Sequence, residues 1–97
     1  MTKKNQEYDL AFTHMKNNQN ISAYNLFMNL ASDQKKINPL KGGLLYILAG
    51  ECKKRQNKDN SDETLEAGKL FLNYAKKENS FKIKGAYLFA AKCFLKA

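Results

Sequence analysis

The sequence lacks the residues that build disulfide frameworks and zinc sites. Its 97 residues contain only two cysteines, Cys52 and Cys93, a single histidine, His14, and no CxxC pair. These are too few ligands for a structural zinc ion and too few thiols for a disulfide framework. The sequence therefore predicts no metal or other cofactor. Two reduced, buried thiols are typical of a cytosolic or nuclear protein.

Long hydrophobic runs are also missing. No apolar stretch approaches the roughly eighteen residues that a membrane-spanning helix needs. The first seven residues, from Met1 to Glu7, are polar and lack the hydrophobic segment of a signal peptide. We therefore expect a cytoplasmic protein without a transmembrane segment, which could still reach a membrane through a partner.

Motifs for catalysis and phosphate binding are absent as well. The acidic group of Asp59, Asp62 and Glu63 lacks the spacing and the glycine of a calcium loop, and no glycine-rich phosphate loop occurs. His14 has no carboxylate or cysteine partner at a recognisable spacing. The pair Gly42-Gly43 follows a predicted helix start, where close packing explains it better than chemistry. The sequence predicts no catalytic residue and no enzyme.

Lysine dominates the charged residues. The net charge is +8, and sixteen of the seventeen basic residues are lysine, Arg55 being the exception. A positive excess favours phosphate binding, but base and phosphate recognition more often uses arginine, and the eleven asparagines beside the lysines indicate an AT-rich genome. Two interpretations remain open. The preferred one is a solvated rim, and the other is a surface that binds nucleic acid or acidic membrane, formed by Lys53, Lys54, Arg55, Lys58, Lys76, Lys77, Lys82 and Lys84.

Hydrophobic periodicity predicts five helices. They are expected over residues 4–16, 20–35, 39–56, 61–77 and 81–97. Asn20 is expected to cap the second helix, and Asn38-Pro39 to start the third, because proline has no amide hydrogen to lose at the first helical position. Asn60 or Ser61 is expected to cap the fourth. No glycine or proline ends the last helix, so we expect the chain to be a fragment of a longer protein.

The predicted helices contain an internal repeat. Ala23–Ala31 matches Ala67–Ala75 at an offset of 44 residues, and Tyr46–Cys52 matches Tyr87–Cys93 at an offset of 41. Repeated helical hairpins stack, because one hairpin cannot bury both of its faces. We predict one all-α domain over residues 1–97, with antiparallel hairpins over 20–56 and 61–97. The hairpins are expected to stack as a tetratricopeptide-like right-handed solenoid of about five helices, the amino-terminal part of a longer one.

The repeated positions indicate packing rather than chemistry. Small residues at these positions let helix backbones approach, and Cys52 and Cys93 occupy equivalent places, so we expect both thiols to act as small buried hydrophobic groups. The repeated aromatic residues fall at core spacing, which favours a core over a ligand cage. They are Phe27, Tyr46, Phe71 and Tyr87.

The hairpin pattern resembles the tetratricopeptide-like superfamily. Within it, residues from Tyr8 to Glu78 resemble the amino-terminal part of the family of forty-kilodalton huntingtin-associated proteins, also called factor VIII intron 22 products. In that family a segment like Leu48-Ala49-Gly50-Glu51-Cys52 precedes a loop and a helix like Glu66–Leu72. The final segment of the last predicted helix, Ala90–Ala97, resembles hairpin helices of the soluble attachment proteins that recruit the membrane-fusion disassembly ATPase.

The first resemblance implies a helical scaffold that binds huntingtin, a very large helical-repeat protein, with links to early endosomes and the nucleus. The second implies a vesicle-fusion adaptor. The chain lacks the proline-rich middle region and the carboxyl-terminal part of the huntingtin-associated family, and the match consists of packing positions. No contact residue is therefore carried over. Together with the repeat, the resemblance predicts a non-catalytic scaffold that binds another protein.

Overall fold

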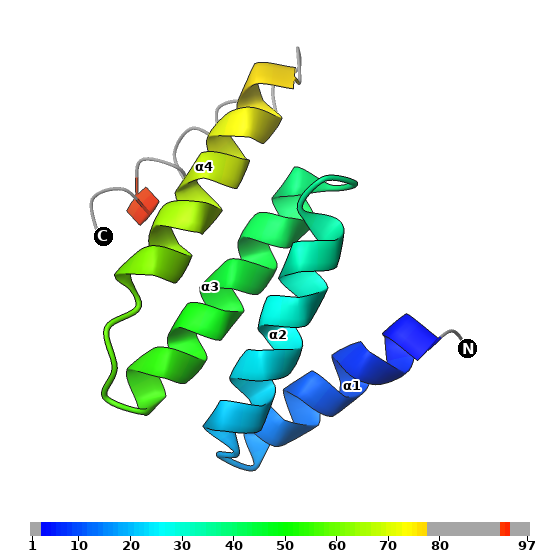
Figure 1. Cartoon of the computed structure of the whole chain (residues 1–97), viewed down its shortest axis with the longest axis vertical. Coiled ribbons are helices and arrows are strands. Elements are labelled where there is room, and N and C mark those ends of the chain that lie inside the picture. The colour runs from blue at the N-terminus through cyan, green and yellow to red at the C-terminus, as the bar shows by residue number, and fades with distance from the viewer. Residues whose placement is uncertain (1–2, 78–91, 94–97) are drawn as a thin grey trace.

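The computed structural model describes residues 3–77 and 92–93 (Figure 1). In these ranges the chain is all-helical, with α1 (Lys3–Lys16), α2 (Asn20–Gln34), α3 (Pro39–Arg55) and α4 (Ser61–Lys77). Every bound of these four helices lies within one residue of its predicted position, which confirms the all-α class. The expected helix over 81–97 lies outside the described residues except for 92–93, which are helical.

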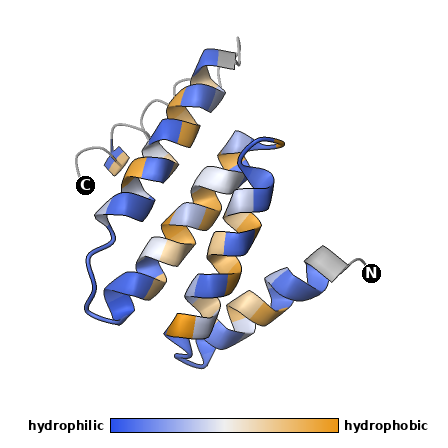
Figure 2. Ribbon diagram, in the orientation of Figure 1, coloured by the Kyte–Doolittle hydropathy of each residue, from blue (hydrophilic) through white to orange (hydrophobic). Residues whose placement is uncertain are grey.

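Consecutive helices run antiparallel and pack side by side (Figure 1). The helix α3 packs against α2 on one side and α4 on the other, while α1 lies against α2 at an angle. Two neighbours explain why α3 is apolar over more than one face. In Figure 2 the turns after α1 and α3 are hydrophilic, and hydrophobic residues gather along α2 and α3.

Side chains at the helix ends fix two of the starts. The side chain of Asn38 accepts a hydrogen bond from the amide of Lys41 at 3.2 Å, and Pro39 is the first residue of α3, as the sequence predicts. At the start of α4, the carboxylate of Asp59 accepts bonds from the backbone amide of Ser61 at 3.2 Å and from its hydroxyl at 2.7 Å. The side-chain amide of Asn60 donates to the Gly50 carbonyl instead, at 3.3 Å.

The predicted cap of α2 is wrong. Asn20 is already inside the helix, and the preceding residue, Gln19, holds the capping position without a side-chain capping bond. The side chain of Gln19 contacts Nδ1 of His14 instead, which ties the ends of α1 and α2 together. The turns after α1 and α3 each place an asparagine, Asn18 and Asn57, at φ 60°, a left-handed conformation that asparagine tolerates better than most residues.

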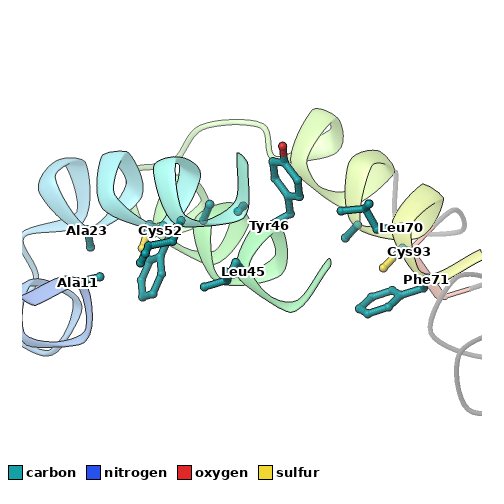
Figure 3. Close-up of a cluster of buried hydrophobic side chains, with 13 residues drawn as sticks. Ala11, Ala23, Leu45, Tyr46, Cys52, Leu70, Phe71 and Cys93 are labelled. Atoms are coloured by element: carbon teal, nitrogen blue, oxygen red, sulfur yellow. The ribbon is translucent and has the colours of Figure 1, made fainter. Parts of the chain in front are cut away.

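The repeated aromatic and cysteine positions that the structure describes are buried, as expected for core residues. Phe27 and Phe71, which are 44 positions apart, are both fully buried. Figure 3 shows Ala11 facing Ala23 where α1 meets α2, and Cys93 close to Phe71 beside α4. Cys52 and Cys93 are buried and neither is in a disulfide, as predicted. Tyr46 is buried too, whereas Tyr87 lies outside the described residues.

Two glycines let α3 approach its neighbours, as the sequence predicts for Gly42-Gly43. A Cβ atom on Gly42 would lie 2.9 Å from the Cα of Lys35, and one on Gly43 would lie 2.8 Å from Cε1 of Phe71. Both distances are shorter than van der Waals contact. These residues therefore set how closely α3 packs against the end of α2 and against α4.

Candidate functional site

Three helices meet at a buried carboxylate. Glu63, in the first turn of α4, is only 3% exposed. Its Oε2 accepts a hydrogen bond from the hydroxyl of Tyr24 on α2 at 2.8 Å and lies 2.9 Å from Nζ of Lys53 on α3. The same Nζ lies 5.4 Å from the centre of the Tyr24 ring. Tyr24, Lys53 and Glu63, here called the ion-pair cluster, thus join α2, α3 and α4.

Within the cluster, Glu63 and Lys53 are both charged near neutral pH, and the Tyr24 hydroxyl keeps its proton. Burial alone raises the pKa of Glu63, but hydrogen bonds from Lys53 and Tyr24 outweigh it, so the pKa is lower than usual. The hydrogen bond to Glu63 raises the pKa of Lys53, and burial followed by the Glu63 contact raises the pKa of Tyr24. None of the three shifts moves a proton toward the neutral range. The arrangement therefore suits holding helices together better than transferring protons.

Acid is expected to destabilise the protein partly through this cluster. The pKa of Glu63 is lower in the folded state than its ordinary value of about 4.3. The unfolded chain then binds the proton more readily, so the stabilisation is present above the ordinary pKa and is lost as the pH falls through the folded-state pKa. Urea unfolding between about pH 7 and pH 3 should show a smaller acid loss in Glu63→Gln than in the unmodified chain.

Glu66→Gln is the matched control. Glu66 lies on the same helix and contacts Lys69 at 3.6 Å, but both side chains are well exposed. Surface ion pairs contribute little to stability, so this variant should keep the pH dependence of the unmodified chain. Equal behaviour of the two variants would show that Glu63 is not a main source of the acid sensitivity.

A pocket opens beside the cluster, where α3 ends and α4 begins. Its volume is about 660 Å³. It lies between the outer side of α3, the turn after α3, the first turn of α4 and residues 92–93, which run next to α4 (Figure 1). The lining residues are Ile47, Glu51, Lys54, Lys58, Asp59, Asn60, Thr64, Lys92 and Cys93.

The structure separates the residues that the sequence grouped as one basic surface. Lys53 is engaged with Glu63, and Arg55 donates to the Met15 carbonyl of α1 at 3.2 Å. Only Lys54 and Lys58 of the predicted set line the pocket. Lys76 is exposed near the other end of α4, roughly 20 Å away at 1.5 Å per residue. Nothing is described for the side chain of Lys77, and Lys82 and Lys84 lie outside the described residues.

Apolar side chains continue from the pocket along α3. Leu44 and Ile47 are three residues apart and therefore share one side of the helix, and they are 45% and 37% exposed. Glu51 and Lys54 follow on the same side at helical spacing. We call these four residues the outer face of α3. It changes from apolar at Leu44 to charged at Lys54, with Ile47 entering the pocket.

The described residues also bear on metal binding and on membrane crossing. No group of three or more histidine, cysteine, aspartate or glutamate residues in the described ranges is arranged to hold a metal ion. None of the helices α1 to α4 has the length and apolar character needed to cross a bilayer. His14 is half-buried, and its contact with Gln19 places it in the turn between α1 and α2.

No protein-family model, no curated protein and no solved structure matches this chain. The resemblance to the huntingtin-associated family therefore stays a prediction.

Proposed function

We propose that the protein is a non-catalytic scaffold that binds another protein through the outer face of α3. The main observation that supports this proposal is the exposure of Leu44 and Ile47 next to a charged pocket. Protein interfaces commonly combine an apolar centre with a polar rim. This face offers both within one helix length, because the apolar residues precede Glu51 and Lys54 along the same side of α3.

The proposal includes a tetratricopeptide-like stacking of hairpins. It is supported by the equivalent burial of repeated residues, such as Phe27 with Phe71, and by the contact of Tyr24 on α2 with Glu63 on α4. That contact brings the first helices of the two expected hairpins together. Stacks of this kind bind partners through extended surfaces rather than deep active sites. The outer face of α3 is such a surface.

The proposal is tested by capture from a cell extract with the immobilised chain. The variant Leu44→Ser with Ile47→Ser removes the apolar part of the outer face. The matched control, Ile21→Ser with Ile37→Ser, removes two isoleucines that are more exposed, 64% and 75%, and lie on α2 and in the turn after it. We expect a defined partner to be retained by the unmodified chain and the control, and lost by the first variant, at low and high salt.

Retention of the same proteins by both variants would contradict the proposal, as would the absence of any specific partner. Circular dichroism of both variants shows whether a loss comes from unfolding. Huntingtin, the partner implied by the family resemblance, is to be sought first in the captured material, together with markers of early endosomes.

A basic module that binds nucleic acid or acidic membrane is the second candidate. The observation in its favour is that Lys54, Lys58 and Lys92 line one pocket. Among the described residues that line this pocket, however, there is neither an aromatic side chain on which a base could stack nor an arginine. Captured RNA or lipid that is lost steeply with added salt would favour this candidate over the scaffold.

A further inference from the structure

The described residues that line the pocket at the α3–α4 turn carry more lysine charge than their own carboxylates neutralise. Three lysines from three segments line it: Lys54 on α3, Lys58 in the turn, and Lys92 beside α4. In the part of the chain that the structure describes, none of the three is in an ion pair. We propose that this pocket binds a short acidic segment of the partner protein, with a carboxylate held between these lysines.

The two acidic residues of the pocket are already engaged within the chain. Glu51 lies 3.8 Å from Nε of Arg55, one turn further along α3. Asp59 accepts two hydrogen bonds from Ser61, which lower the pKa of its carboxyl group. Among the described lining residues, three lysines thus accompany two carboxylates, one of which has its own arginine. The remaining positive charge favours an anionic ligand.

The uncharged residues of the pocket fit a peptide. Ile47 and Cys93 supply an apolar surface against which an aliphatic side chain could pack, and Thr64 supplies a hydroxyl. The volume of about 660 Å³ has room for a few side chains and lies within the usual range of binding pockets. Because the apolar part continues into Leu44 and Ile47, a bound segment could extend along the outer face of α3.

The same lining disfavours a nucleic acid. A regular polyanion would bring successive phosphates close to Glu51 and Asp59, which would repel them. A peptide with one or two carboxylates can place them at the lysines, while its backbone amides donate to these two acidic residues. Charge complementarity therefore selects a protein segment with spaced acidic residues and apolar residues between them.

The inference rests on the proposed scaffold function and can be tested with a defined probe. The probe is a fluorescent peptide of alternating leucine and glutamate, titrated with the whole chain and followed by fluorescence anisotropy. We expect the variant Lys54→Glu with Lys58→Glu to weaken binding by about tenfold or more, since the reversed charges repel the probe. Lys92→Glu alone should weaken it in the same direction.

A matched control changes the net charge by the same amount elsewhere. Lys36→Glu with Lys76→Glu reverses two exposed lysines that do not line the pocket, and it should change the affinity by no more than about twofold. Equal losses in the two double variants would overturn the inference, because binding would then depend on net charge alone. Failure of the unmodified chain to bind the peptide at about 0.15 M salt would also overturn it.

Two further experiments distinguish an acidic peptide from a nucleic acid, and this inference from the proposed function. A single-stranded RNA of similar charge, used as competitor, should not displace the peptide from the unmodified chain. Displacement, together with direct RNA binding that Lys54→Glu with Lys58→Glu abolishes, would reassign the pocket to nucleic acid. The variant Leu44→Ser with Ile47→Ser tests the proposed function separately. If its partner is lost while the acidic peptide fails to bind the unmodified chain, the scaffold proposal stands and only the ligand assigned to the pocket is wrong.

Discussion

Phe27→Ala is expected to lower the free energy of unfolding by about 3–5 kcal/mol, the usual loss when a large buried aromatic side chain is removed. Phe27 is fully buried, and its ring meets that of Phe12 edge to face with centroids 5.2 Å apart. It lies in the middle of α2 between α1 and α3. Small domains have only about 5–15 kcal/mol of stability in total, so urea unfolding should show a large shift of the midpoint.

Phe12→Ala is the matched control for this prediction. Phe12 is the other ring of the pair, but it is 49% exposed. Its removal should therefore destabilise the fold by about 1 kcal/mol, from partial burial and the ring contact. If the two variants unfolded at the same urea concentration, Phe27 would not be the centre of the core where α1, α2 and α3 meet.

Alanine at Gly42 or Gly43 is expected to destabilise the protein, although alanine favours helix over glycine by about 1 kcal/mol. The new Cβ would overlap the backbone of Lys35 in the first case and the buried ring of Phe71 in the second. Overpacking of this kind typically costs about 1–3 kcal/mol. The effect should be larger for Gly42, since backbone atoms can yield less than a side chain.

Gly50→Ala, in the same helix, should have the opposite sign. Its nearest neighbours would be Nδ2 of Asn60 and Cβ of Glu63, both at 3.4 Å, which is ordinary contact. The variant should gain up to about 1 kcal/mol from helix propensity. All three variants replace glycine by alanine in the same helix, so the change in helix propensity is similar in each. Differences among their thermal unfolding midpoints therefore report the packing of the new methyl group. Stabilisation by all three changes would contradict the close approach of α3 to α2 and α4.

Local signals explain why the helices could be predicted from the sequence. Proline at a first helical position and the polar turns after α1 and α3 act through nearest neighbours along the chain, and these features are visible in sequence. The equivalence of Phe27 and Phe71 could be predicted as well, since both hold the same place in the repeat. The cap of α2 could not, because the helix begins one residue earlier than the cap prediction requires, so that Asn20 lies inside it and Gln19 holds the capping position.

The ion-pair cluster was missed because its residues are distant in sequence. Tyr24 and Glu63 are 39 positions apart and meet only when α2 and α4 pack together. From the sequence alone, Glu63 is one of an acidic group that lacks calcium-loop spacing, and Lys53 is part of a candidate basic surface. Each interpretation was reasonable for a solvent-exposed residue. One feature of the sequence indicated that Glu63 is buried. It lies four residues before Ala67, and residues at this spacing share one side of a helix, here the buried side of α4.

The pocket could not be predicted for the same reason. Lys54 and Lys58 stand out by their charge, but Lys92, 34 residues after Lys58, joins them only because residues 92–93 lie next to α4. Ile47 lies within the apolar run Leu44–Ala49, in which hydrophobicity alone does not distinguish buried from exposed residues. Its partial exposure depends on where the neighbouring helices end, which periodicity does not specify.

The most direct test of the proposed binding surface is an NMR titration of the isotopically labelled chain with the acidic leucine-glutamate peptide. We predict that the largest amide shift changes fall between Leu44 and Asn60, at Thr64, and at residues 92–93, with little change at Lys36 and Lys76. Shift changes spread evenly over the exposed lysines, or confined to other helices, would contradict a partner site on α3.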